Sequence, residues 1–154
     1  MNMTKQIIIE HLRTGDKKYE YSEWAERLIQ EIVANSFGLD IGHQTTGFNS
    51  DYDFKLNNTT IELKISGYDD LQIEYARDND EPSGISVAKA RVYMTLTPGW
   101  STYGGSFKHV GKLRIFKTYQ LRECIQPLQD QEEHTITYPP HDGGRGSKCV
   151  KLTK

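Results

Sequence analysis

Three charged residues, Asp53, Glu62 and Lys64, lie in two short segments that are separated by a tight turn. Both segments alternate apolar and charged residues, which is typical of β-strands with one buried face. An Asn-Asn pair lies between them and suits a two-residue hairpin loop, because asparagine tolerates the positive φ angles of such loops. In the register that this loop sets, Asp53 opposes Glu62 and Asp51 opposes Lys64, so one face of the hairpin carries all four charges.

The chemistry of this charged face depends on the two opposed carboxylates. They repel each other, and a divalent cation between them would remove the repulsion. Carboxylate oxygens with no cysteine or histidine nearby favour Mg²⁺, with Mn²⁺ as a substitute, over zinc. The ammonium of Lys64 could stabilise charge that develops on a phosphate or orient an attacking water. The residues therefore indicate metal-assisted hydrolysis of phosphodiester bonds, whereas the competing interpretation is a plain hairpin with a solvated charged face.

The segment SDYDFKLNNTTIELKIS resembles the active-site hairpin of the PD-(D/E)xK nuclease superfamily, which includes many type II restriction enzymes, junction resolvases and some homing endonucleases. The resemblance implies that Asp53 is the first acid of the motif, Glu62 the second acid and Lys64 the lysine. Tyr52 stands where the superfamily has its proline, a position that often varies. Asp51 is the alternative for the first acid, although Phe54 directly after Asp53 makes Asp53 the better match.

Upstream of the hairpin, apolar residues recur at helical spacing and predict an amphipathic helix that is capped by Ser22 and ends before Gly38. Glu26 borders the apolar stripe, at the edge of the surface that would pack on a sheet. Many members of the superfamily bring a glutamate of the first helix to the metal site, so the resemblance implies that Glu26 is a third metal ligand and catalytic residue. Glutamate near a helix N-terminus is also favoured by the helix dipole alone. The alternatives for this role are Glu20, Glu23 and Glu31.

The remaining patterns predict a small mixed sheet. Residues 68–81 are rich in acidic residues and predict a loop. The further expected helices are a short piece at 87–90 and a helix at 119–125 capped by Thr118. The further expected strands are 92–97, 112–117, 135–138 and 149–152. We expect one domain over residues 1–154 of the α/β class, with a restriction-endonuclease-like core in which helices flank a central mixed sheet.

The charge of the chain is unevenly distributed. Residues 1–104 contain 10 Lys and Arg against 16 Asp and Glu, and residues 105–154 contain 9 against 5. The acidic part contains the expected metal site, and the basic part could contact phosphates, although such asymmetry is also common in proteins that bind no nucleic acid. The residues expected to contact DNA are Lys108, Lys112, Arg145 and Lys148.

These features together predict a Mg²⁺-dependent DNA endonuclease. Restriction or homing activity is favoured, and structure-specific junction resolution is possible. Cleavage of both strands by one small domain needs two active sites, so a homodimer or higher homo-oligomer is expected. The absence of a long apolar stretch or signal peptide predicts a cytoplasmic protein of a bacterium or phage-infected cell, with no membrane partner. The alternative is a catalytically silent nucleic-acid-binding or interaction module on the same fold.

Overall fold

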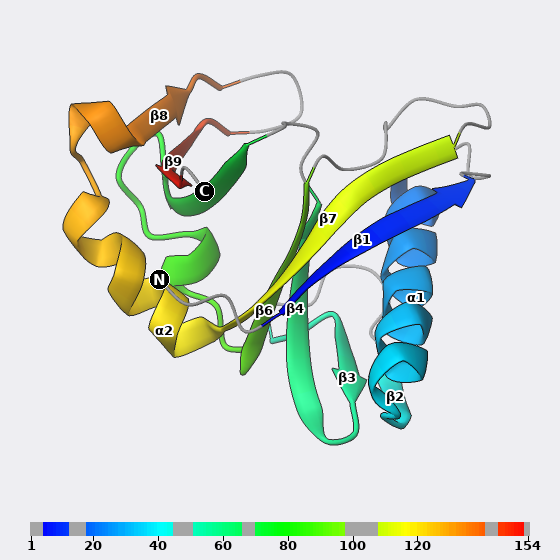
Figure 1. Ribbon diagram of the computed structural model, residues 1–154. Coiled ribbons are helices and arrows are strands. Elements are labelled where there is room, and N and C mark those ends of the chain that lie inside the picture. The colour runs from blue at the N-terminus through cyan, green and yellow to red at the C-terminus, as the bar shows by residue number, and fades with distance from the viewer. Residues whose placement is uncertain are drawn as a thin grey trace.

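In the computed structural model, two β-sheets and two helices make up the part of the chain that is described (Figure 1). It describes residues 5–12, 18–44, 51–65, 70–97, 108–140 and 145–152, and only the backbone of 5–12, 18–25 and 108–111. The helices are α1 (Lys18–Phe37) and α2 (Thr118–Ile125), with short 3₁₀ turns η1 (Gly84–Ser86), η2 (Gln126–Leu128) and η3 (Glu132–His134). The strands are β1 (Lys5–Leu12), β2 (Ile41–Gln44), β3 (Phe54–Leu56), β4 (Thr59–Ile65), β5 (Leu71–Arg77), β6 (Val92–Thr97), β7 (Lys108–Lys117), β8 (Thr135–Tyr138) and β9 (Ser147–Leu152).

The main sheet has six strands in the order β1-β7-β6-β4-β3-β2. Strands β4 and β6 are parallel, and every other neighbouring pair is antiparallel. A parallel pair needs a crossover connection, which is usually an α-helix. Here β5 and η1 form that connection, and β5 belongs to the second sheet, which has the order β5-β9-β8. The expected mixed sheet is confirmed, but the expected helical piece at 87–90 is wrong, because the only helical turn described there is η1, at Gly84–Ser86.

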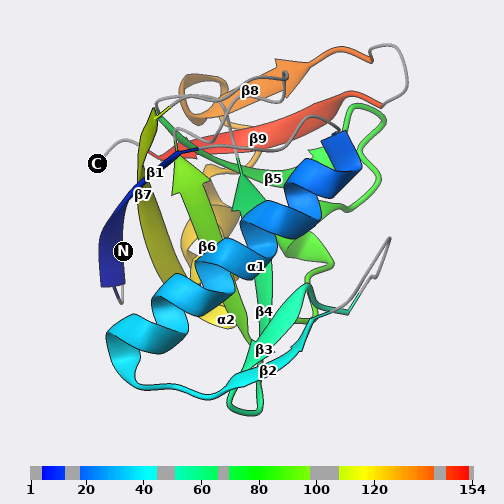
Figure 2. The same ribbon diagram turned by 90° about the vertical axis from the view of Figure 1, so that its right-hand side faces the viewer.

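Helix α1 covers one face of the main sheet (Figure 2). Its side chains Ile29 and Val33 are buried against Leu63 of β4, Leu96 of β6 and Leu113 of β7. The helix ends at Phe37, and Gly38 follows it with a φ of 63°, as the sequence predicts. It begins at Lys18, however, so the predicted cap at Ser22 is wrong and Ser22 lies inside the helix.

The other face of the main sheet packs against α2 and the second sheet (Figure 1). Tyr93 of β6 and Phe116 of β7 share a buried cluster with Ile73 of β5, Leu121 of α2 and Val150 of β9. Helices therefore flank the main sheet on both sides, as expected. The predicted loop at residues 68–81 is wrong for half of its length, because β5 (Leu71–Arg77) pairs with β9.

The hairpin of β3 and β4 has the register that the sequence predicts. Leu56 pairs with Thr59, and Phe54 pairs with Ile61. Asn57 has a φ of 52°, as a two-residue loop requires. The structure thus shows a mixed α/β fold with a mixed main sheet, and no helix in the described ranges is long and apolar enough to cross a membrane.

Candidate active site at the open end of the hairpin

Asp53 lies directly before β3, where the regular pairing of the hairpin ends. Its backbone N–H donates to the carbonyl oxygen of Ile61 at 2.9 Å, although Ile61 is the partner of Phe54 in the ladder. The N–H of Leu63 donates to Oδ2 of Asp53 at 2.8 Å. The side chain of Asp53 therefore takes the place of a backbone acceptor, and the carboxylate is fixed against β4. The predicted direct opposition of Asp53 and Glu62 is not part of the regular ladder.

The carboxyl group of Asp53 has a perturbed acidity. Burial, followed by the negative charge of Glu62, raises its pKa from 3.8 to about 6. The hydrogen bond from the Leu63 N–H and the charge of Lys64 act in the opposite direction but do not outweigh these effects. Asp53 and Glu62 are therefore close enough to repel each other. A bound cation would relieve this repulsion.

Lys64 and Glu62 form an ion pair on β4. The Nζ atom of Lys64 is 2.9 Å from Oε1 of Glu62, and the side chains are 51% and 17% exposed. Burial lowers the pKa of Lys64, but the negative charges of Glu62, Asp53 and Glu74 together raise it above its usual value. Lys64 is therefore an ammonium at neutral pH, which suits stabilisation of negative charge better than removal of a proton from water.

A further acid, Glu74, lies near Asp53, Glu62 and Lys64, and the sequence patterns did not point to it. It lies on β5 and is half-buried, and its charge acts on both Lys64 and the phenol of Tyr93. The signal that could have found it is the alternation of Leu71, Ile73 and Tyr75, which predicts a strand with Glu74 on the opposite face from these three.

Asp51 and Glu26 were also named from the sequence, and they have other surroundings. Asp51 forms an ion pair with Lys89 at 3.5 Å in which both side chains are mostly exposed. Glu26 is half-buried on α1, one turn before Ile29. Helix α1 covers one face of the sheet, and Glu62 projects from the other face. A carboxylate on this helix could therefore approach Asp53 and Glu62 only around the edge of the sheet.

Asp53 and Glu62 offer hard oxygen ligands that suit Mg²⁺ or Mn²⁺. Among the side chains that the structure describes, no three Asp, Glu, His or Cys residues lie close enough together to hold a metal ion. Glu26 therefore does not complete a three-residue group with Asp53 and Glu62. Two carboxylates still fit Mg²⁺, because this ion usually keeps several waters and takes further ligands from a substrate phosphate.

Comparison with known proteins assigns the chain to no family. No family model, curated protein or solved structure matches the chain.

The basic residues expected to contact DNA are distributed over two regions. Lys112 is exposed on β7, and Lys108 begins the same strand, where only the backbone is described. Arg145 lies 3.0 Å from Glu81, and Lys148 pairs with Asp80, both at the second sheet. These acids neutralise part of the positive charge that Arg145 and Lys148 could offer to a phosphate.

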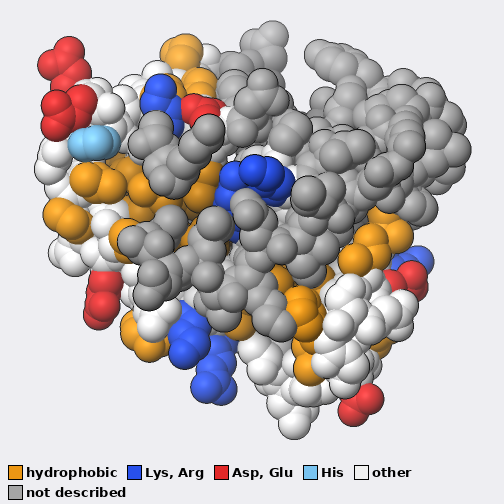
Figure 3. Space-filling model, viewed as in Figure 1, with side chains coloured by type: hydrophobic (Ala, Val, Ile, Leu, Met, Phe, Trp, Pro, Cys, Tyr) orange, Lys and Arg blue, Asp and Glu red, His pale blue; other side chains and the backbone are white. Residues whose placement is uncertain are grey.

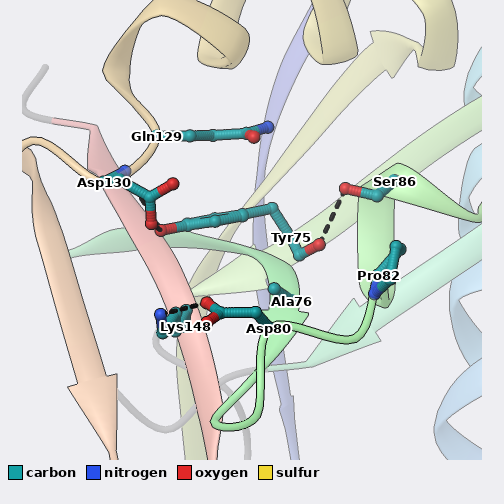
Figure 4. Close-up of a pocket in the computed structure, with 8 residues that line it drawn as sticks. All are labelled: Tyr75, Ala76, Asp80, Pro82, Ser86, Gln129, Asp130 and Lys148. Carbon is teal, nitrogen blue, oxygen red and sulfur yellow. Dashed lines mark hydrogen bonds and ion pairs between the residues drawn. The ribbon is translucent and has the colours of Figure 1, made fainter.

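Lys148 also lines a pocket of about 630 Å³ next to the second sheet. Figure 4 shows Lys148 and Asp80 in direct contact with each other in the lining of this pocket. The hydroxyl of Tyr75 donates to Oδ1 of Asp130 at 2.9 Å and accepts the Asp130 N–H at 3.1 Å. The polar groups of the pocket are thus largely paired with one another.

Proposed function

We propose that the protein is a metal-dependent DNA endonuclease with a restriction-endonuclease-like core. The observation that carries the proposal is the pair of carboxylates at the open end of the hairpin. Asp53 is fixed by the Leu63 N–H beside Glu62, and burial and the Glu62 charge raise the pKa of Asp53 to about 6. Keeping two acids together in this way is unfavourable without a cation, and Lys64 supplies a third charged group at the same place.

Each side chain has a distinct proposed role. Asp53 and Glu62 would hold the metal, and Glu26 would be a further ligand only by reaching around the sheet edge. Bound Mg²⁺ would supply a Lewis acid for the phosphate and would lower the pKa of a bound water. Lys64, which lies 2.9 Å from Oε1 of Glu62, would stabilise negative charge on the phosphate or orient the attacking water.

The connectivity of the main sheet also supports the proposal. Helix α1 is followed by β2, β3 and β4, and β6 returns parallel to β4. A strand that returns beside the hairpin is what the resemblance implies for the core. The connection through β5 departs from the expected helix, and the second sheet is an addition to that core.

The second candidate is a catalytically silent nucleic-acid-binding or interaction module. Two observations favour it: the described side chains form no three-residue metal group, and Lys64 neutralises Glu62 directly. The two candidates differ in metal dependence, because a silent module would bind DNA equally well with and without Mg²⁺.

The deciding experiment incubates the protein with supercoiled plasmid, phage DNA and a four-way junction in Mg²⁺, in Mn²⁺ and in EDTA. We expect cleavage with metal and none in EDTA. Discrete bands would indicate restriction or homing activity, and cutting of the junction alone would indicate resolution. The matched variants are Asp53→Asn, which should not cleave, and Asp51→Asn, which should. Absence of cleavage under every condition would favour the silent module. Sedimentation with and without DNA would test the expected homodimer.

A further inference from the structure

The sheet face that carries Glu62 and Lys64 is divided into an apolar and a polar part. Tyr93 and Phe116 form the apolar part, which α2 and the second sheet cover. The polar part lies toward the C-terminal ends of the parallel strands β4 and β6. Its members on the central strands are Glu62, Lys64, Thr95, Thr97, Lys112 and Arg114.

Within the polar part, three residues stand side by side across three strands. Lys64 of β4 pairs with Thr95 of β6, and Thr95 pairs with Arg114 of β7. Neighbouring strands lie about 4.8 Å apart, so the backbones of Lys64 and Arg114 are separated by about 10 Å. Paired residues project to the same side of a sheet, so the two long cationic side chains rise on either side of Thr95. In Figure 3, Lys and Arg side chains gather near the middle of the viewed face.

Arg114 is a half-buried cation without a compensating carboxylate among the described residues. Its Nη1 atom donates to Oγ1 of Thr97, which orients the guanidinium over the end of β6. Burial lowers the pKa of Arg114, but an arginine remains charged. An unpaired, partly desolvated guanidinium is unfavourable in the free protein and becomes favourable when an anion arrives.

Thr95 provides a second and independent sign of a missing ligand. Its side chain is only 3% exposed, and Oγ1 has no hydrogen-bond partner among the groups that the structure describes. A buried hydroxyl without a partner destabilises the folded state relative to an apolar side chain of the same shape. Its position between Lys64 and Arg114 would let it donate to an oxygen atom held by the two cations.

We propose that Thr95 and Arg114, with Lys64 on the other side, bind a phosphoryl group. The guanidinium offers parallel N–H donors that match two phosphate oxygens, and the hydroxyl donates to a third. That the phosphoryl group is a phosphodiester of DNA rests on the proposed function. In that setting Arg114 and Thr95 are positioning residues that place the DNA backbone against Asp53 and Glu62. They are distinct from the metal ligands, so binding persists without metal.

The main test measures binding of a short DNA duplex in EDTA at several salt concentrations by fluorescence anisotropy. Arg114→Gln should weaken binding and reduce the slope of log affinity against log salt by about one, because one phosphate contact is lost. Arg91→Gln is the matched control, since Arg91 is exposed and lies directly before β6, about 13 Å along the chain direction from Thr95. Equal affinities and slopes for the wild type and Arg114→Gln would overturn the inference.

Thr95→Val gives a test that does not depend on the arginine. It should raise the melting temperature of the ligand-free protein, because it removes the unpaired hydroxyl, and it should weaken DNA binding in EDTA. A residue with a merely structural role would not improve stability and impair binding together. Unchanged affinity in Thr95→Val would remove Thr95 from the site.

Inorganic phosphate separates this inference from the proposed function. It should raise the melting temperature of the wild type and of Arg91→Gln, and it should raise that of Arg114→Gln by a smaller amount. If it does so while no metal supports cleavage, the phosphoryl site stands and the nuclease proposal fails. If metal-dependent cleavage occurs but Arg114→Gln keeps wild-type affinity for DNA in EDTA, the nuclease proposal stands and the inference fails.

Discussion

Replacing Asp53 by Asn should stabilise the metal-free protein at neutral and alkaline pH. The pKa of Asp53 rises from 3.8 to about 6 on folding, and a difference of this size corresponds to about 3 kcal/mol of folding free energy. Asn removes the charge, keeps an oxygen that can accept the Leu63 N–H, and loses the attraction to Lys64. Because the site is partly open to solvent, we expect about half of this value to be realised, a gain of about 1–2 kcal/mol.

The gain should depend on pH in a defined direction. The folded state binds the Asp53 proton more tightly than the unfolded state does. The contribution of protonated Asp53 to the wild-type free energy of unfolding is therefore complete below pH 3.8, and it is lost as the pH rises through about 6. The advantage of Asp53→Asn should therefore be full near pH 8 and small near pH 4. For a chain of this size it corresponds to a rise of about 3–6 °C in melting temperature, measured by calorimetry in EDTA.

Asp51→Asn is the control for this experiment. Its exposed ion pair with Lys89 is worth at most about 1 kcal/mol, so its loss should lower stability slightly or leave it unchanged. Mg²⁺ should raise the melting temperature of the wild type and of Asp51→Asn but not that of Asp53→Asn. A stability gain in Asp51→Asn alone would show that the first acid is misassigned. An equal metal response in both variants would refute the metal site.

Further measurements test the other charged groups and the support of the hairpin. Lys64→Ala should lose cleavage and keep its circular dichroism spectrum and its metal-induced melting shift; cleavage within several-fold of wild type would exclude Lys64 from the mechanism. Ca²⁺ should strengthen DNA binding in a gel-shift assay but not support cleavage, because it accepts irregular coordination and activates water poorly. Gln30→Leu should cost about 1–3 kcal/mol in urea unfolding, because the buried Gln30 amide donates to the carbonyl oxygens of Gly42 and Lys55 at 3.1 and 3.0 Å.

Local patterns were sufficient to predict the hairpin and most of α1. The alternation around Asn57 and the apolar stripe that ends at Gly38 are properties of neighbouring residues, and the structure has both features. The β6 range and the β8 range were also predicted, since Pro98 and Pro139 bound their alternating residues on one side. The start of α1 could not be predicted, because Lys18 has no side chain typical of a helix cap in front of it and Ser22 does look like one.

Features that depend on distant segments were missed. The sequence predicts a loop where β5 lies, because acidic residues surround it, and the paired residues of its partner β9 lie 70 to 81 positions further along the chain. The polar row of Lys64, Thr95 and Arg114 follows from the registers of three strands, two of which are joined by an unexpected connection. Glu74 reaches the cluster for the same reason. The motif could be found in the sequence, but the groups around it could not.

The position of β9 in the second sheet has a consequence for the order of folding. This strand lies between β5 and β8, and it follows every other described strand along the chain. Pairing across such a long separation requires a large loss of chain entropy and is expected to form late. In pulse-labelled hydrogen exchange during refolding, amides of β4 should become protected before those of β5. Until then Leu71, Ile73 and Tyr75 lack the cover that β9 gives them, so we expect this part of the second sheet to stay open to chaperones and to aggregation.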